Sequence, residues 1–255
     1  MAGSESAIWE DCAARAVPGP LGGTLTRVVE SQEQIATTRL VDGDLARQDA
    51  LERLLEERSK PPRRPGTERF DYLLAAPWRY PPLRYGSRFG RPFEPSLFYG
   101  SRSVDTALAE TAYYRFVLLD DMARPPARVV TQHTSFEARY RGERGLRLQA
   151  PPFDAFAREL AHPADYRACQ ALGTALREAE IDAFEFRSAR DPDGGVNVAL
   201  LEPAALASNR HLRPREWSCV SARDEVAFRT RARPSRLVRH ARETFEVDGV
   251  LPRPA

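Results

Sequence analysis

The chain has 255 residues, of which 42% are hydrophobic, and its formal net charge is +2 at pH 7. This length and apolar content are enough for one large domain, or for one domain with an extension. The small net charge excludes a strong field for nucleic acid, so direct nucleic-acid binding is not expected.

The cysteines and histidines form no pattern typical of a disulfide framework or a metal site. Cys12, Cys169 and Cys219 are widely spaced, and the four histidines lack paired spacing. We therefore expect reduced thiols and no metal. No apolar run approaches the ~18 residues of a membrane span, and the start of the chain lacks the pattern of a signal peptide. The sequence predicts a soluble, cytoplasmic protein.

The first quarter of the chain is predicted to lie outside the main domain. Residues 1–23 are rich in Gly, Ala, Ser and Pro and are expected to be a flexible lead-in. Residues 24–62 are expected to form a helical N-terminal extension, because apolar residues recur at helical spacing over 25–38 and over about 44–59. The proline cluster at 61–65 ends this extension. The main domain is assigned to residues 63–235, and 236–255 to a basic, proline-rich C-terminal tail.

Within the main domain, short strands are mixed with two helices. Strands are predicted at 70–75, 96–99, 127–136, 181–186 and 196–201, with a further strand within 216–230 and a strand-like piece at 146–152. Pro77, Pro81 and Pro82 are expected to keep the chain after the first strand extended. Helices are predicted at 104–119, capped by Ser103, and at 164–179. Because strands and helices do not alternate regularly, the order favours an α+β fold with a mixed sheet and inserted helices.

Three residues between positions 78 and 114 suit a ligand that carries phosphate and positive charge. Arg88 follows a Gly-Ser turn, where a guanidinium and backbone N–H groups can hold phosphate oxygens. Tyr99 ends an apolar strand and could stack on a flat heterocycle, with core packing as the alternative. Glu110 lies near the apolar face of its helix, where it either pairs with an arginine or acts on a ligand.

Ser188 lies where the strand at 181–186 runs into a polar turn. It has no GxSxG elbow, so an acyl-transfer nucleophile is not indicated; a hydrogen bond to a ligand or an ordinary turn serine are the two interpretations. Glu110 could stabilise the oxocarbenium-like state of glycosidic cleavage. One carboxylate suffices when the leaving group is already cationic, as the nicotinamide of NAD+ is.

These motifs resemble the RES domain family, which is named after its arginine, glutamate and serine. The resemblance rests on GSRFG, LFYGS, ALAE and FRSARDPDGGVNVALLEP, and covers roughly residues 70–205. It implies an ADP-ribosyltransferase-like fold. It also implies a bacterial toxin that destroys NAD+ by phosphorolysis or hydrolysis, with inorganic phosphate as a candidate co-substrate and no bound cofactor. The implied partner is a helix-turn-helix antitoxin of the Xre type.

The resemblance also implies roles for individual residues. Arg88, Glu110 and Ser188 are the expected catalytic residues: Arg88 would hold the pyrophosphate, Glu110 would stabilise the ribosyl cation, and Ser188 would orient ribose or phosphate. Tyr99 would stack near the nicotinamide. Further contacts to the dinucleotide are expected from Arg79, Arg84, Tyr85 and Asn197.

The chain departs from the family pattern in three places. Phe89-Gly90 replaces the commoner Trp-Asn, and Arg187 replaces the proline before the serine; both could alter substrate geometry. The region before Pro61 is absent from the shortest members and is expected to serve dimerisation or antitoxin binding. A protein mono-ADP-ribosyltransferase and a non-catalytic binding module are the alternative functions for the same site.

Overall fold

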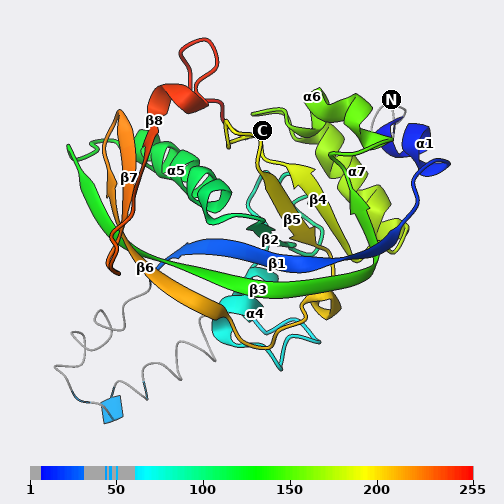
Figure 1. Ribbon diagram of the computed structural model, residues 1–255, viewed down its shortest axis with the longest axis horizontal. Coiled ribbons are helices and arrows are strands. Elements are labelled where there is room, and N and C mark those ends of the chain that lie inside the picture. The colour runs from blue at the N-terminus through cyan, green and yellow to red at the C-terminus, as the bar shows by residue number, and fades with distance from the viewer. Residues whose placement is uncertain (1–6, 32–43, 45, 48–49, 51–60, 255) are drawn as a thin grey trace.

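The computed structural model describes residues 7–31, 44, 46–47, 50 and 61–254 (Figure 1). The strands in this part of the chain are β1 (Gly19–Glu30), β2 (Phe98–Ser101), β3 (Val129–Arg147), β4 (Ala183–Arg187), β5 (Val196–Leu200), β6 (Leu212–Ser221), β7 (Glu225–Thr230) and β8 (Leu237–Ala241). The α-helices are α1 (Ala7–Ala13), α4 (Tyr72–Arg79), α5 (Val104–Asp121), α6 (Ala157–Leu160) and α7 (Arg167–Glu178). Short 3-10 helices are η2 (Phe153–Phe156), η3 (Pro203–Ala205) and η4 (Arg242–Phe245).

All eight described strands belong to one mixed sheet with the order β1-β2-β5-β4-β3-β6-β7-β8. Strand β1 also pairs with β3, so that β1, β2, β5, β4 and β3 form a closed ring. Among the described pairs only β3 and β4 run parallel. Strands β6 to β8 extend the sheet from the other end of β3. This arrangement confirms the predicted α+β fold with a mixed sheet and inserted helices.

The N-terminal region differs from its prediction. Residues 19–30 are strand β1, paired with β3 along its length, rather than flexible chain followed by a helix. The segment Thr24 to Val29 is rich in β-branched residues and favours a strand. Its run of helically spaced apolar residues is short, so pairing with β3 along the whole strand outweighs any preference for a helix. Helix α1 also lies within the predicted flexible lead-in, and its Ile8 and Cys12 are buried. Residues 32–43 and nearly all of the helix predicted at 44–59 lie outside the described residues.

The strand predicted at 70–75 is wrong, because helix α4 begins at Tyr72. Asp71 caps this helix, and its side chain accepts a hydrogen bond from the backbone N–H of Leu74 at 3.1 Å. Leu74 and Trp78, four residues apart, bury one face of the helix. Pro77 lies inside α4 and does not hold the chain extended as predicted. The cap and the buried face outweigh the local β propensity.

The C-terminal half also contains more strand than predicted. Strand β3 runs without a break from the predicted strand at 127–136 into the start of the piece predicted at 146–152, because β1 pairs with its middle and β6 with its first half. The segment 216–230 holds parts of two strands, β6 and β7. The predicted C-terminal tail contributes β8, which pairs with β7, and buries Phe245 and Leu251. The predictions for 104–119, capped by Ser103, for 164–179 and for the strands 181–186 and 196–201 are confirmed, within a few residues.

Helices cover the sheet on both sides (Figure 1). Helix α4 packs against the ring of strands in one apolar cluster, which includes Trp78 and Phe98. Helices α1 and α7 pack with β4 in a second cluster, and α5 packs on β6 and β7 in a third. Helix α5 therefore lies between the ring and the sheet extension, in contact with β1, β2 and β7. Among the described helices none is long and apolar enough to cross a membrane.

Candidate active site

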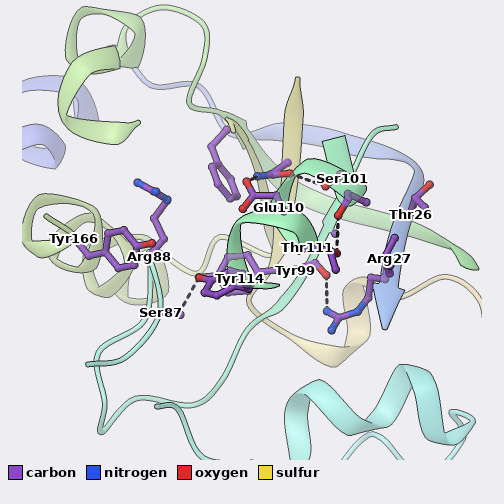
Figure 2. Close-up of a pocket in the computed structure, with 15 residues that line it drawn as sticks. Thr26, Arg27, Ser87, Arg88, Tyr99, Ser101, Glu110, Thr111, Tyr114 and Tyr166 are labelled. Carbon is purple, nitrogen blue, oxygen red and sulfur yellow. Dashed lines mark hydrogen bonds between the residues drawn. The ribbon is translucent and has the colours of Figure 1, made fainter. Parts of the chain in front are cut away.

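A cavity of about 300 Å³ lies between the first turns of α5 and the strands β1 and β2 (Figure 2). Arg88 and Glu110, which come from a loop and a helix, both line it. Tyr99 from β2 and Asn197 from β5 line it as well. The other lining residues are Thr26, Arg27, Val28, Ser87, Gly100, Ser101, Ala107, Thr111, Tyr114, Tyr166 and Phe186.

The loop that carries Arg88 is a tight turn fixed by glycines. Gly86 has a φ of +75°, a conformation that side chains disfavour. The backbone N–H of Ser87 donates to the carbonyl of Gly90 at 2.7 Å and closes the turn. On the other side, Gly173 of α7 has no side chain, so the backbone of Phe89 packs directly onto the helix. The Gly-Ser turn read from the sequence therefore places Arg88 rigidly.

The guanidinium of Arg88 is held by two backbone carbonyls and an aromatic ring. Its Nη1 donates to the carbonyl of His162 at 2.8 Å and to that of Leu160 at 3.3 Å. Its Cζ lies 4.5 Å from the ring centroid of Tyr166, which is buried beneath it. A guanidinium carries five N–H donors, so donors on the other nitrogens can still bind an anion in the cavity.

Glu110 enters the cavity from α5, about two turns after the Ser103 cap. Its Oε1 accepts hydrogen bonds from Ser188 Oγ and from Asn197 Nδ2, both at 2.6 Å. Asn197 is oriented in turn by Ser101, whose hydroxyl donates to its Oδ1 at 2.7 Å. Within the described residues no donor is bound to Oε2 of Glu110. One carboxylate oxygen is thus fixed by the protein, and the other can face a developing positive charge.

Ser188 is behind Glu110 rather than in the cavity wall. Its side chain is 4% exposed. Its Oγ accepts hydrogen bonds from the backbone N–H groups of Arg190 and Asp191, at 3.1 and 3.0 Å. Its single proton goes to Glu110. Ser188 therefore positions the carboxylate, and the expected direct hydrogen bond to ribose or phosphate is not supported by this geometry.

Tyr99 links the Arg88 loop to β2. Its hydroxyl accepts a hydrogen bond from the backbone N–H of Phe89 at 3.1 Å and is 3.0 Å from Ser87 Oγ. Burial raises the pKa of Tyr99 to about 12, so the phenol stays neutral. Its ring meets Phe186 edge-on, with 6.2 Å between centroids. Tyr99 lines the cavity, but its hydroxyl is engaged by the protein and its ring packs at right angles to Phe186.

Three predicted contacts lie elsewhere. Arg79, Arg84 and Tyr85 are not among the described residues that line the cavity. Arg79 is buried, and its Nε donates to the carbonyl of Pro61. Arg84 is exposed, and the carbonyl of Tyr85 accepts a hydrogen bond from Gln170 at 2.8 Å. They are close to Arg88 in sequence, but α4 and the following loop carry them to other surroundings.

The cavity residues of β1 were not predicted from the sequence. Arg27 extends from β1 to the carbonyl of Tyr99, to which its Nη1 donates, and its Cζ lies 4.7 Å from the Phe98 ring centroid. Burial lowers the pKa of Arg27 to about 10, which still leaves it charged at neutral pH. Had Thr24–Val29 been predicted as a strand, its side chains would have been expected to alternate between two faces. Arg27 would then have stood out as the charged residue of that strand. Tyr114 could have been found from its position four residues after Glu110, on the same helix face.

The comparison with protein families agrees with this constellation. A family model described as RES domain matches residues 61–221, more than half of the chain. The chain belongs to the RES domain family. The match includes Arg88, Glu110 and Ser188, but it begins after β1 and ends before β7, which the structure places in the same sheet.

A solved structure with a similar arrangement is a chain of the M. tuberculosis MbcT-MbcA toxin-antitoxin complex. The sequences are 14% identical, the alignment covers 81% of this chain and 90% of that chain, and the TM-score is 0.45. No curated protein matches the sequence. Across the described ranges no group of three or more His, Cys, Asp or Glu side chains is placed to hold a metal ion.

Proposed function

We propose that this RES domain protein is a toxin that depletes NAD+ by cleaving the bond between nicotinamide and ribose. The observation that carries the proposal is the pairing of Arg88 and Glu110 across one cavity, with Glu110 fixed through a single oxygen. A fixed cation suits the pyrophosphate, and a fixed carboxylate suits the ribosyl cation. Family membership supports the same substrate, because the resemblance noted from the sequence implies NAD+ degradation.

In this reaction the bond between ribose C1′ and the nicotinamide nitrogen breaks. The electron pair stays on nicotinamide, which leaves neutral, so no general acid is needed. The positive charge moves to the ribosyl ring, where the free oxygen of Glu110 stabilises it. An oxygen of phosphate or water then bonds to C1′, and a water acceptor releases its proton to solvent. Ser188 and Asn197 hold Glu110 in place during this charge shift.

The biological setting follows from the family resemblance. We infer a bacterial cytoplasmic toxin whose activity is neutralised by a helix-turn-helix antitoxin of the Xre type. No bound cofactor takes part, since NAD+ is the substrate. A homodimer built through the region before Pro61 is a further expectation of the same resemblance.

The test is to incubate the purified chain with NAD+, with and without inorganic phosphate, and to identify the products by mass spectrometry. We expect free nicotinamide together with phosphorylated ADP-ribose when phosphate is the acceptor, or ADP-ribose when water is. Glu110→Gln and Arg88→Ala should each lower the rate by at least roughly 100-fold. The folding of both variants is checked by circular dichroism.

Two other outcomes are informative. If label from NAD+ becomes attached to protein while little free ADP-ribose forms, the site belongs to a protein mono-ADP-ribosyltransferase. If the wild-type chain consumes no NAD+, and the two variants arrest bacterial growth as strongly as the wild type does, the catalytic proposal is wrong. The site would then be a non-catalytic binding module.

A further inference from the structure

Among the aromatic residues that line the described cavity, Tyr114 contributes least to the packing of the protein. It lies on α5 four residues after Glu110, about 6 Å further along the helix axis. Its side chain is 44% exposed even though it lines the cavity. The exposed surface of Tyr114 therefore opens into the cavity and its mouth.

The ring of Tyr114 is supported by its neighbour on the helix and remains partly exposed. It contacts Tyr113 edge-on, with 5.0 Å between the ring centroids. Tyr113 is itself fixed, because its hydroxyl donates to the carbonyl of Pro252 at 2.5 Å and the Cζ of Arg190 lies 3.5 Å from its ring centroid. In the described part of the chain the Tyr114 hydroxyl has no hydrogen-bond partner. A supported aromatic ring that is 44% exposed is suited to stacking on a flat base.

The other aromatic residues of the cavity are already engaged. Tyr99 is tied to the Arg88 loop through its hydroxyl and meets Phe186 edge-on. Tyr166 stacks against the Arg88 guanidinium. Phe186 also packs against Phe89 in the core, with 4.8 Å between ring centroids. Among the described aromatic residues of the cavity, Tyr114 is therefore the most exposed, and its hydroxyl is the one not bonded to the protein.

We propose that Tyr114 is the stacking surface for a heteroaromatic base of the dinucleotide. This inference rests on the proposed function and moves the stacking role from Tyr99 to Tyr114. The base is either nicotinamide, which leaves next to Glu110, or adenine, which lies at the other end of the dinucleotide. A cavity of about 300 Å³ is at the small end for ligand sites, so part of the dinucleotide projects beyond it.

The test measures binding by calorimetry in the Glu110→Gln background, where turnover does not interfere. The probes are NAD+ and nicotinamide mononucleotide, which lacks adenine. Tyr114→Ala should weaken NAD+ binding roughly 5- to 100-fold, the range found for one stacked base. Tyr114→Phe keeps the ring and should bind like the parent. Tyr80→Ala is the matched control, because Tyr80 is 40% exposed and lies outside the described cavity lining.

The pattern across the two probes identifies the base. If Tyr114→Ala loses affinity equally for NAD+ and for nicotinamide mononucleotide, the stacked base is nicotinamide. If it loses affinity for NAD+ alone, the stacked base is adenine; either result supports the inference. Unchanged NAD+ binding by Tyr114→Ala, in a variant that melts within a few degrees of the parent, overturns it. If the wild type binds NAD+ through Tyr114 but does not cleave it, the proposed reaction fails and the inference stands. If the parent binds no NAD+, both fail.

Discussion

Replacing Tyr166 by leucine is expected to weaken NAD+ binding by releasing the Arg88 guanidinium. Tyr166 is 3% exposed, and its ring centroid is 4.5 Å from Arg88 Cζ. A cation–π contact in such a desolvated place contributes about 2 kcal/mol, which corresponds to roughly 30-fold in affinity. Tyr166→Phe keeps the stack and loses only a long hydrogen bond with Arg190 Nη2 at 3.4 Å. It should therefore bind NAD+ within about twofold of the parent.

A double-mutant cycle separates this effect from general core packing, since a buried tyrosine also contributes to stability. Arg88→Lys keeps the charge and removes the planar fork that stacks on the ring. If Tyr166 acts through Arg88, the double variant Arg88→Lys/Tyr166→Leu should bind NAD+ no more weakly than the poorer single variant. Calorimetry on Glu110→Gln protein gives the dissociation constants, and thermal melts show whether each variant is folded. If the losses of NAD+ binding free energy in the two single variants simply add in the double variant, Tyr166 does not act through Arg88.

Three further results are expected. Ser188→Ala removes a donor to the Glu110 carboxylate and should lower kcat at least roughly tenfold with a smaller change in KM; steady-state kinetics that match the wild type would contradict the positioning role. Gly173→Ala should destabilise the fold by about 1–3 kcal/mol, because a Cβ there would overlap the backbone of Phe89; Gly19→Ala, which meets open space, is the control in the same urea titration. Burial, followed by the charge of Arg115, lowers the pKa of His133 to about 4 from 6.5, so only the unfolded chain takes up this proton between those values. The stability that the neutral His133 contributes should thus be fully present above pH ~6.5, and the free energy of unfolding should fall by up to about 3 kcal/mol towards pH ~4. His133→Gln should reduce this dependence on pH; an unchanged slope between these pH values would exclude His133 as its cause.

The candidate site could be located from the sequence because its key residues belong to short local motifs. Arg88 follows a glycine turn, Tyr99 ends a strand, and Glu110 lies on a capped helix. Each of these elements is determined within about ten residues, so its side-chain position could be inferred locally. The same reasoning failed for Arg79, Arg84 and Tyr85. Closeness in sequence to Arg88 does not determine where α4 and the next loop turn.

The errors at the two ends of the domain have a common cause. Strands β1 and β8 are both stabilised by pairing with another strand: β1 with β3, far along the chain, and β8 with β7, the strand just before it. A short apolar run is compatible with a helix or a strand, and the choice depends on the hydrogen-bonding partner that the fold supplies. Local composition therefore misassigned β1 as flexible chain and helix, and β8 as tail.

By itself the sequence determined the fold class, the family and the identity of most groups that can act on a ligand, because these depend on local residue patterns. The tertiary structure decided how the groups are used. It turned Ser188 towards Glu110, engaged Tyr99 with the Arg88 loop, and left the ring of Tyr114 open to the cavity. These assignments depend on contacts between residues 10 to 90 positions apart, where burial and hydrogen-bond partners are fixed only once the sheet has closed.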